Sequence, residues 1–425
     1  MTSSPQPPPY PQSFPIVRNT LLLSGCMAVN GAGISLSAAV ATITFVLVTG
    51  VDGLLGLGPA IFLTSAAGSA WVGGKAMDRW GRIPVLAVGF MTGIAGNLLT
   101  GLGVHLNSAA VVVVGLLGVG AGNGIINLTR TAGGDMYPPE RRARGISYVL
   151  FGAVFGAILG PSVFIPLFSG REIAGTALVL AWCASAGFLF FGLLLALSVR
   201  PDPKRIAETF APPSGIEDDA PAVAASLHTM FARPGVIGAL LAALASFSVM
   251  VSVMNLTGRL VVTDLGHAAE SVFPIVAAHI VGMFALVVVV GDIIDRIGRR
   301  PALVAGLLVV ALSSLSLAWL QGVAVIAFAL FALGLGWIFA FVAASAELVD
   351  RTRPFERGKL LGFNDLCSSL LSAALALIGG YLLSRYGPGV LAGLSAAIAL
   401  APILWILRPS RNSAAPEALG TLGSR

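Results

Sequence analysis

Residues 74–84 read GKAMDRWGRIP, and residues 291–301 read GDIIDRIGRRP. The two stretches share the skeleton Gly-x-x-x-Asp-Arg-x-Gly-Arg-x-Pro without a gap and start 217 residues apart (291 minus 74). Only 10% of the 425 residues are charged, so each copy concentrates charge that the rest of the chain lacks. The two stretches are therefore copies of one repeat, and we expect their surroundings to be repeated too.

Long apolar stretches occupy most of the chain around this repeat. The sequence is 56% hydrophobic with a mean hydropathy of +0.91, whereas soluble domains have roughly 25% charged residues. A helix needs about 20 apolar residues to cross a membrane. Twelve stretches approach or exceed that length: 20–48, 54–74, 84–104, 109–129, 146–168, 173–199, 235–258, 271–291, 301–320, 322–346, 366–384 and 388–407. The sequence therefore predicts an all-α integral membrane protein with twelve transmembrane helices, not a soluble protein or a cleaved signal peptide.

The basic residues predict the orientation. With a cytoplasmic N-terminus, 22 of the 25 Lys and Arg residues fall at or near the cytoplasmic side, and only Arg171, Arg259 and Arg385 fall outside. Such an excess marks the cytoplasmic side of a membrane protein. We therefore expect both termini in the cytoplasm, and the formal charge of +6 needs no nucleic-acid partner. The three cysteines have unrelated spacing and indicate neither a disulfide framework nor a metal site.

A polar break divides the chain into two halves. Residues 200–234 carry prolines and an acidic run, with a short amphipathic helix expected near 222–232. Each half places its copy of the repeated phrase between its second and third span. We predict a disordered cytoplasmic N-terminus (1–18), a first six-helix half (19–199), a cytoplasmic linker (200–234), a second six-helix half (235–408) and a cytoplasmic tail (409–425).

A second, weaker repeat follows each phrase. It is a glycine-led helix that ends in an acid, followed by Pro, Glu and basic residues. The separation from Asp78 to Asp135 is 57 residues and that from Asp295 to Asp350 is 55, so these acids correspond, although Glu347 is an alternative to Asp350. The two halves are parallel in order, as in transporters built from repeated halves.

With both repeats placed, the chain resembles the major facilitator superfamily of membrane transporters. The resemblance covers nearly the whole chain except the N-terminus, the linker and the tail. It implies a secondary transporter that works by alternating access, with no enzymatic activity, no cofactor and no metal. The residues that carry it are Gly74, Asp78, Arg79, Gly81, Arg82 and Pro84 with Asp135 in the first half, and Gly291, Asp295, Arg296, Gly298, Arg299 and Pro301 with Asp350 in the second half.

The resemblance also implies roles for these charges. By similarity to the family, Asp78 would brace against the start of span 11, and Arg82 would pair with Asp135 at the end of span 4. The expected counterpart in the second half is Arg299 with Asp350. We predict that these contacts form and break as the halves rock. The alternative is that the charges only anchor the loops at the lipid headgroups.

Span 5 carries a partial antiporter signature. Gly152, Gly156 and Gly160, followed by Pro161, lie on one helical face, similar to the Gly-Pro signature of facilitators that work as antiporters. The same glycines suit close helix packing. A Phe-Ile pair stands where Gly-Gly is expected, and span 4 lacks the arginine that drug and proton antiporters often carry ahead of its glycines.

The family architecture implies a substrate cavity between the halves, lined mainly by spans 1, 4, 7 and 10. The candidate polar residues in these spans are Asn30, Asn123, Asn127, Asn255 and Trp337. We predict that substrate binds among them.

Three ionisable residues lie at depth, where a charge costs about 2.5–3.5 kcal/mol on insertion scales. They are Arg130 late in span 4, Asp365 early in span 11 and His279 in span 8. We predict that Arg130 and Asp365 form a bridge between the halves, the alternative being an arginine at the headgroups and an aspartate that caps span 11. His279 either carries the coupling proton or is a neutral hydrogen-bonding residue between spans 5 and 8. Proton coupling then runs through His279, Asp365 or the edge acids Asp52 and Asp264.

Other functional classes lack their motifs, since the sequence has no phosphate-binding loop, no nucleophile elbow and no His-Glu-x-x-His. We expect proton-coupled export of a small amphiphilic or drug-like molecule, with uptake or uniport of a neutral metabolite as the alternative and a transporter-like sensor as a remote one. The expected partners are the substrate, protons and the lipid bilayer. The preference for Arg over Lys hints at a bacterial cytoplasmic membrane, where the chain is expected to act as a monomer.

Overall fold

The structure is a computed structural model that describes residues 14–49, 57–168, 175–210, 225–261, 265–267 and 271–408. The first half contains α1 (Ile16–Thr49), α2 (Leu57–Trp80), α3 (Arg82–His105), α4 (Ala109–Ile126), α5 (Thr129–Asp135), the 3₁₀ turn η2 (Pro139–Arg141), α6 (Arg142–Phe168) and α7 (Gly175–Leu197). The linker contains α8 (Pro203–Thr209) and α9 (Leu227–Phe231). The second half contains α10 (Val236–Arg259), α11 (Val272–Phe284), α12 (Val287–Ile297), α13 (Arg299–Ser316), α14 (Val323–Asp350), α15 (Arg357–Tyr386) and α16 (Pro388–Ile406).

Among the described residues, twelve helical segments have the length of a membrane span, with α4 and α5 counted as one segment and α11 and α12 as another. By length and composition, eight helices among the described residues qualify, and α11 with α12 forms a ninth, bent span. The helices α1, α2 and α15 are 34, 24 and 30 residues long and complete the predicted twelve, since a span needs about 20 residues. α1 begins at Ile16, slightly before the boundary expected at residue 19.

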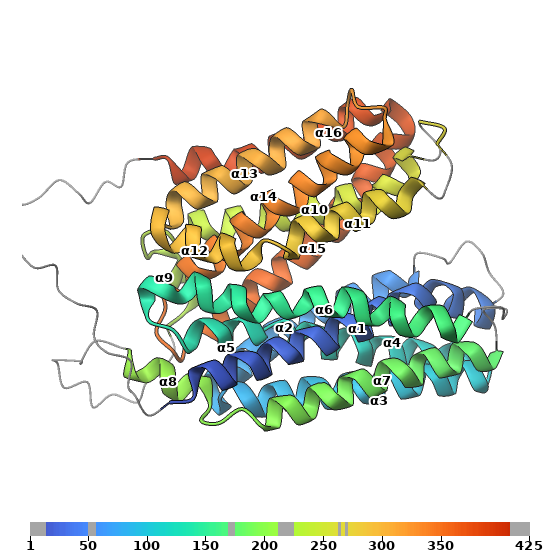
Figure 1. Cartoon of the computed structure of the whole chain (residues 1–425), viewed down its shortest axis with the longest axis horizontal. Coiled ribbons are helices and arrows are strands. Elements are labelled where there is room, and N and C mark those ends of the chain that lie inside the picture. Colours follow the sequence, from blue (N-terminus) through green and yellow to red (C-terminus); the bar gives the residue numbers. More distant parts are fainter. Residues whose placement is uncertain are drawn as a thin grey trace, which may run out of the picture.

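The two halves form two bundles. Figure 1 shows the first half, in blue and green, below the second half, in yellow to red, with α8 and α9 at the same end of both. At this end, called the linker end below, α2 packs against α15 and α6 packs against α12. The ribbons of the halves diverge toward the opposite end (Figure 1). The polar contacts that join the halves, described below, lie toward the linker end.

Two of the spans are broken. Span 4 consists of α4 and α5, separated by a turn at Asn127 and Leu128, and span 8 consists of α11 and α12, which meet at a bend of 42°. The apolar stretches that predict these two spans, 109–129 and 271–291, each run across a break. A break is tolerated at membrane depth where the freed backbone groups find partners inside the protein. At the break in span 4, the Arg130 guanidinium donates to the Asn127 carbonyl oxygen at 2.9 Å.

Glycines allow the closest approaches between helices. At the crossing of α2 and α15, a Cβ on Gly74 would lie 2.0 Å from the Gly358 carbonyl oxygen. Where α6 crosses α1, a Cβ on Gly152 would lie 1.8 Å from the Ser24 carbonyl oxygen. No side chain fits at either glycine without moving the backbone. The glycine stripe of span 5 thus packs closely on span 1, which is one of the two roles considered for it.

The other glycines of the repeated phrase either allow a close helix contact or form a turn. A Cβ on Gly291 would lie 2.5 Å from the Ser147 hydroxyl oxygen, so this glycine lets α12 approach α6. Gly81 and Gly298 each separate two helices and have φ angles of 96° and 89°. Glycine is the residue that adopts such angles without steric cost. A glycine turn therefore joins the second and third span in both halves.

Candidate functional site

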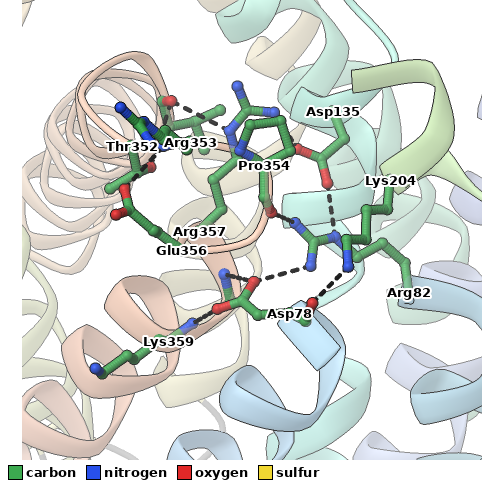
Figure 2. Close-up of polar contacts among 12 residues, drawn as sticks. Asp78, Arg82, Asp135, Lys204, Thr352, Arg353, Pro354, Glu356, Arg357 and Lys359 are labelled. Carbon is green, nitrogen blue, oxygen red and sulfur yellow. Dashed lines mark hydrogen bonds and ion pairs between the residues drawn. The ribbon is translucent and has the colours of Figure 1, made fainter. Parts of the chain in front are cut away.

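The first charge cluster joins the two halves at the linker end. It consists of Asp78 on α2, Arg82 on α3, Asp135 on α5 and Arg357 on α15, and Figure 2 shows it. The Arg82 Nε donates to Asp135 at 2.7 Å, and its Nη1 donates to Asp78 at 3.0 Å. Arg357 donates to the other carboxylate oxygen of Asp135. All four residues are buried, so two carboxylates and two guanidinium groups compensate one another away from solvent.

Contacts with the start of α15 extend this cluster. Asp78 accepts hydrogen bonds from the backbone N–H groups of Gly358 at 2.8 Å and Lys359 at 2.6 Å. The free N–H groups and the dipole at a helix N-terminus stabilise a carboxylate there. The Arg82 Nη2 donates to the Pro354 carbonyl oxygen at 2.6 Å, in the loop before α15. Asp78 thus contacts the start of span 11, and Arg82 is paired with the acid expected for it.

The second charge cluster repeats this arrangement with the halves exchanged. It consists of Asp295 on α12, Arg299 on α13, Asp350 on α14 and Arg142 on α6. Arg299 donates to Asp295 at 2.6 Å and to Asp350 at 3.1 Å. Arg142 donates to Asp350 at 2.6 Å. Asp350 is therefore the partner of Arg299, whereas the alternative, Glu347, pairs with an arginine one turn further along the chain.

The second cluster also reaches a helix start in the opposite half. Asp295 accepts hydrogen bonds from the backbone N–H groups of Ala143 at 3.3 Å and Arg144 at 3.0 Å, at the start of α6. The Arg299 Nη2 donates to the Pro139 carbonyl oxygen at 2.8 Å. Each of these partners lies 215 residues before its counterpart at the start of α15, as for the two prolines (354 minus 139). The two contact sets are therefore related residue by residue.

Sequence reasoning missed two members of these clusters, Arg142 and Arg357. Both belong to the basic residues that follow the Pro and Glu of the second repeat, and they are themselves 215 residues apart (357 minus 142). This shared separation of 215 residues is the sequence signal that could have identified them. Each arginine provides a second donor to the acid that ends span 4 or span 10.

The linker covers the first cluster. The Asp202 carboxylate accepts hydrogen bonds from the backbone N–H groups of Arg82 at 3.1 Å and Ile83 at 2.9 Å, and so caps α3. It also accepts one from the N–H of Lys204 at 2.8 Å, at the start of α8. The Lys204 Nζ donates to the Asp78 backbone carbonyl at 2.5 Å (Figure 2). These residues were also missed, although an Asp followed by Pro is a recognisable helix start.

A salt bridge ties the other end of the linker to the loop before α15. The Arg233 guanidinium donates to both carboxylate oxygens of Glu356, at 2.6 and 2.9 Å. Burial opposes the ionisation of Glu356, but the hydrogen bonds from Arg233 and from the backbone N–H of Arg353 outweigh it. The pKa of the Glu356 carboxyl is therefore below its ordinary value.

The remaining signature arginines differ from those in the clusters. Arg79 and Arg296 are exposed, and the Arg79 guanidinium lies over the Trp80 ring, 5.6 Å from its centroid. Neither takes part in an ion pair within the part of the chain that the structure describes. An exposed arginine at such a loop can reach the lipid headgroups, which is the role considered above as the alternative to gating.

A cavity of about 200 Å³ lies between the halves. Its lining comes from α1, α2, α4, α5 and α6 of the first half and from α10, α11, α14 and α15 of the second. The Asn123 side-chain oxygen accepts hydrogen bonds from the side-chain amides of Asn30 at 3.4 Å and Asn127 at 3.3 Å. Asn123 and Asn127 line the cavity, so the first half presents an amide network to it.

The second half supplies an aromatic wall to this cavity. Its members are Phe247, Phe284, Trp337 and Phe341, and the rings of Trp337 and Phe341 are stacked with their centroids 4.9 Å apart. The Trp337 Nε1 is buried and has no hydrogen-bond partner among the described residues, although a buried indole N–H usually finds one. The wall of the cavity therefore combines flat aromatic surface with a buried indole N–H that has no partner among the described residues.

Arg130 and Asp365 form an ion pair between the halves. The Arg130 Nη2 donates to the Asp365 carboxylate, and both residues line the cavity. Their side chains are 3% and 15% exposed, so the pair is largely shielded from solvent. The Arg130 guanidinium also lies over the Phe341 ring, 4.9 Å from its centroid. The bridge that the sequence predicts between these two residues is present.

Among the remaining candidate residues, His279 is described by the structure and does not line this cavity. His279 donates from Nδ1 to the Leu330 carbonyl oxygen of α14 at 2.8 Å, so its partner is on span 10 and not between spans 5 and 8 as considered above. Its Nε2 has no hydrogen-bond partner within the described residues. The side chain of Asn255 and the acids Asp52 and Asp264 lie outside the part that the structure describes.

Two six-helix halves with a polar and aromatic cavity between them define the fold of a secondary membrane transporter. The sequence profile described as the Major Facilitator Superfamily matches residues 21–376 and, in a second match, residues 275–422. The chain therefore belongs to this family, as its signature residues predict.

Relatives and solved structures agree with this assignment. The chain is 28% identical over 399 residues to the uncharacterized MFS-type transporter YdeG of Bacillus subtilis, covering 91% of each protein. It is 28% identical over 350 residues to the riboflavin transporter RfnT of Brucella anthropi, covering 80% of this chain and 83% of the relative. The fold matches that of the proton:xylose symporter XylE with a TM-score of 0.75 at 15% identity, covering 92% of this chain and 95% of the other. The protein is thus a multi-pass membrane transporter with bacterial relatives.

Proposed function

We propose that this protein moves a small molecule across the bacterial cytoplasmic membrane by alternating access, with the central cavity as its binding site. The observation that carries the proposal is the position of this cavity. Both halves line it, and the two charge clusters hold the halves together at its linker end. Rocking of the halves would expose the cavity to each side in turn. From the basic residues we take the linker end to be cytoplasmic, so this conformation is closed to the cytoplasm.

In this mechanism the charge clusters form the cytoplasmic gate. Asp78 holds the start of α15 and Asp295 holds the start of α6, each across the boundary between the halves. Opening toward the cytoplasm requires both carboxylates to release these N–H groups. The ion pair of Arg130 and Asp365 is a third contact between the halves, next to the cavity, and must break as well.

The substrate that suits the cavity is planar, partly apolar and rich in hydrogen-bond acceptors. Flat rings pack well on aromatic side chains such as Trp337 and Phe341. The Trp337 Nε1 and the Arg130 Nε are buried donors without partners among the described residues, and a carbonyl oxygen or ring nitrogen of a substrate would satisfy them. Riboflavin, the compound for which the relative RfnT is named, has this chemistry. Planar drugs and dyes with acceptor groups share it.

Export in exchange for protons is the direction we propose, with Asp365 as the proton-carrying group. Asp365 lines the cavity and pairs with Arg130. Exchange requires that substrate and proton occupy the site in turn, so substrate would bind while Asp365 is ionised, and protonation of Asp365 would break its pair with Arg130 and favour release of the substrate. The partial signature of span 5 supports exchange. Uptake of a planar metabolite is the second candidate, and the similarity to RfnT, described as a riboflavin transporter, supports a planar metabolite as the substrate.

Transport by the purified chain in proteoliposomes tests this proposal. Riboflavin and a planar cationic dye are added one at a time, with xylose as the nonplanar comparison, while substrate movement and internal pH are recorded. We expect transport of a planar compound with a coupled pH change. Asp365→Asn cannot take up a proton, so it should lose the pH change. Substrate movement without any pH change would remove proton exchange and leave a uniporter.

Two sets of variants test the cavity itself. Trp337→Phe keeps the ring and removes the N–H donor, so substrate binding should weaken about fivefold, the usual effect of one hydrogen bond. Trp319→Phe is the matched control, because Trp319 is 71% exposed.

Exchanging the charges of Arg130 and Asp365 should restore part of what each single change loses. Failure of the double variant to recover would argue against a functional pair.

A further inference from the structure

A second, larger cavity lies at the linker end of the second half, away from the central site. It has a volume of about 380 Å³ and lies between the ends of α10, α13, α14 and α16. Two arginines on its lining, Arg300 at the start of α13 and Arg408 after the end of α16, are exposed. Nothing in the transport mechanism proposed above uses this cavity.

The acid that lines this cavity does not balance the positive charge of the two exposed arginines. Glu347, which lines it, is paired with Arg351 at 2.9 Å, and Arg233, which also lines it, is paired with an acid elsewhere. Neither Arg300 nor Arg408 has a carboxylate within ion-pair distance in the described ranges. Among the described residues, two guanidinium groups are therefore left without a counter-charge, and that of Arg408 lies over the Trp405 ring, 4.8 Å from its centroid.

An apolar groove continues from the cavity along the start of α13 and the end of α16. This groove, of about 450 Å³, runs between α13 and α16 and shares Arg300 and Ile406 with the cavity. The rest of its lining is apolar or proline and includes Val304, Leu308 and Leu407. Leu308 is 41% and Leu407 is 66% exposed, so a further apolar chain could lie against them. A cationic pocket thus opens directly into an apolar groove.

We propose that this pocket and groove bind an anionic phospholipid of the leaflet at the linker end. The lipid phosphate lies between Arg300 and Arg408, and one acyl chain follows the groove between α13 and α16. Arginine binds phosphate oxygens through paired N–H groups, and basic pockets on the cytoplasmic side of membrane helices bind acidic headgroups. Trp405 is at the headgroup level, where tryptophan is common in membrane proteins.

The repeat gives an independent reason to assign this role to Arg300. Arg300 occupies the tenth position of its phrase, and the matched residue in the first half is Ile83. Ile83 is 9% exposed, and its backbone N–H is bound by Asp202 of the linker. The linker therefore covers this position in the first half, whereas the second half has an exposed arginine there. The lipid site therefore belongs to the second half and is not part of the gate that the repeat forms in both halves.

Lipid retention by the purified full chain tests the proposal. Native mass spectrometry counts the lipids that remain bound after exposure to phosphatidylglycerol or to phosphatidylcholine of the same chain length. The variants are Arg300→Ile, which restores the first-half residue, and Arg408→Gln. Arg205→Gln is the control, because Arg205 is an exposed arginine of the linker that does not line the cavity. We expect selective retention of phosphatidylglycerol, about fivefold weaker for each arginine lost and unchanged in the control.

Further arms separate a lipid from other occupants. Ala305→Trp fills the groove with a bulky side chain and should also weaken retention, since Ala305 lines the groove. Inorganic phosphate is added alone, with thermal unfolding as the readout. Equal retention of the two lipids, or retention unchanged in Arg300→Ile and Arg408→Gln, would overturn the proposal. Stabilisation by inorganic phosphate equal to that by phosphatidylglycerol would overturn it too, because the groove would then contribute nothing.

Discussion

The two charge clusters have the same contacts but differ in burial. In the first cluster the side chains of Arg82 and Asp135 are fully buried, whereas in the second those of Arg299 and Asp350 are 11% and 21% exposed. The repeat explains the shared contacts, because it places the same residue types at the ends of corresponding helices. The difference comes from outside the repeat, since Asp202 and the helix α8 that follows it lie against the first cluster. A connecting segment thus changes the environment of one of two matched sites.

The stability lost when one charge of a cluster is removed depends on how deeply that cluster is buried. Removing one partner of a buried ion pair costs about 3–5 kcal/mol, because the other charge is left without solvent or a partner. An exposed pair contributes only about 0–1 kcal/mol. We therefore expect the first cluster to tolerate the loss of a charge less well than the second.

The largest effect is expected for Asp135→Asn. Arg82 and Arg357 both donate to this carboxylate, so two buried guanidinium groups would lose their shared counter-charge. We expect a loss of about 3–5 kcal/mol in the free energy of unfolding. Thermal unfolding of the purified chain in detergent measures it.

Asp350→Asn is the matched control for this change. Asp350 accepts hydrogen bonds from Arg299 and Arg142 in the same pattern but is partly exposed. We expect it to be clearly less destabilising than Asp135→Asn. Equal losses in the two variants would contradict the role given to burial.

Asp78→Asn is expected to have a smaller effect. It should slow transport and leave insertion of the protein into the membrane unchanged. The neutral side chain can still accept a hydrogen bond from α15, but the charge that favours a helix N-terminus is lost. Turnover per inserted molecule should fall, and it should fall less for Asp295→Asn, whose cluster is more exposed. Unchanged transport kinetics in well-expressed Asp78→Asn would rule out a gating role for this carboxylate.

Much of the shared geometry could be predicted from the sequence. Twelve spans follow from the length of the apolar stretches, because few other structures bury so much apolar surface. The pairing of Arg82 with Asp135 could be predicted from the resemblance to the family, and its counterpart, Arg299 with Asp350, because the same charges recur at matched positions of the second half. The bridge of Arg130 and Asp365 could be predicted because two opposite charges at similar depth, in different halves, each need a partner.

The rest could not be predicted, for physical reasons. A break in a span leaves its apolar pattern unchanged, so the turn at Asn127 and the bend between α11 and α12 have no signal in hydropathy. Phe247 and Phe284 look like any lipid-facing aromatic residue until the halves are placed together. The contacts of Asp202 depend on how the linker folds back, and no periodicity in the linker encodes that.

Asp202→Ala tests whether the linker causes the difference between the clusters. Asp202 caps both α3 and α8, and loss of a capping side chain costs about 0.5–2 kcal/mol. We expect faster hydrogen exchange at the Arg82 and Ile83 amides and a modest loss of thermal stability. Asp292→Ala is the comparison, since Asp292 pairs with Arg144 beside the second cluster and is 33% exposed. Unchanged exchange at the start of α3 would mean that the linker does not protect the first cluster.

The smallest effect is expected for Glu356→Gln and depends on pH. Burial raises the pKa of Glu356, but the Arg233 salt bridge outweighs this, so the pKa lies below its ordinary value of 4.5. A carboxyl with a lowered pKa stabilises the folded state above the unfolded pKa and loses this contribution as the pH falls through the folded pKa. The variant should therefore unfold at a lower temperature than the wild type at neutral pH, and the two should converge below pH 4.5.

This pH dependence separates the two attachments of the linker. Arg233→Gln removes the group that lowers the pKa of Glu356, so it should remove the same acid-dependent difference. If hydrogen exchange at the start of α3 stays slow in both variants, the burial of the first cluster depends on α8 and Asp202 alone. If exchange there becomes faster, the salt bridge before α15 also holds the linker over the first cluster. The difference between the clusters would then depend on both ends of the segment that connects the halves.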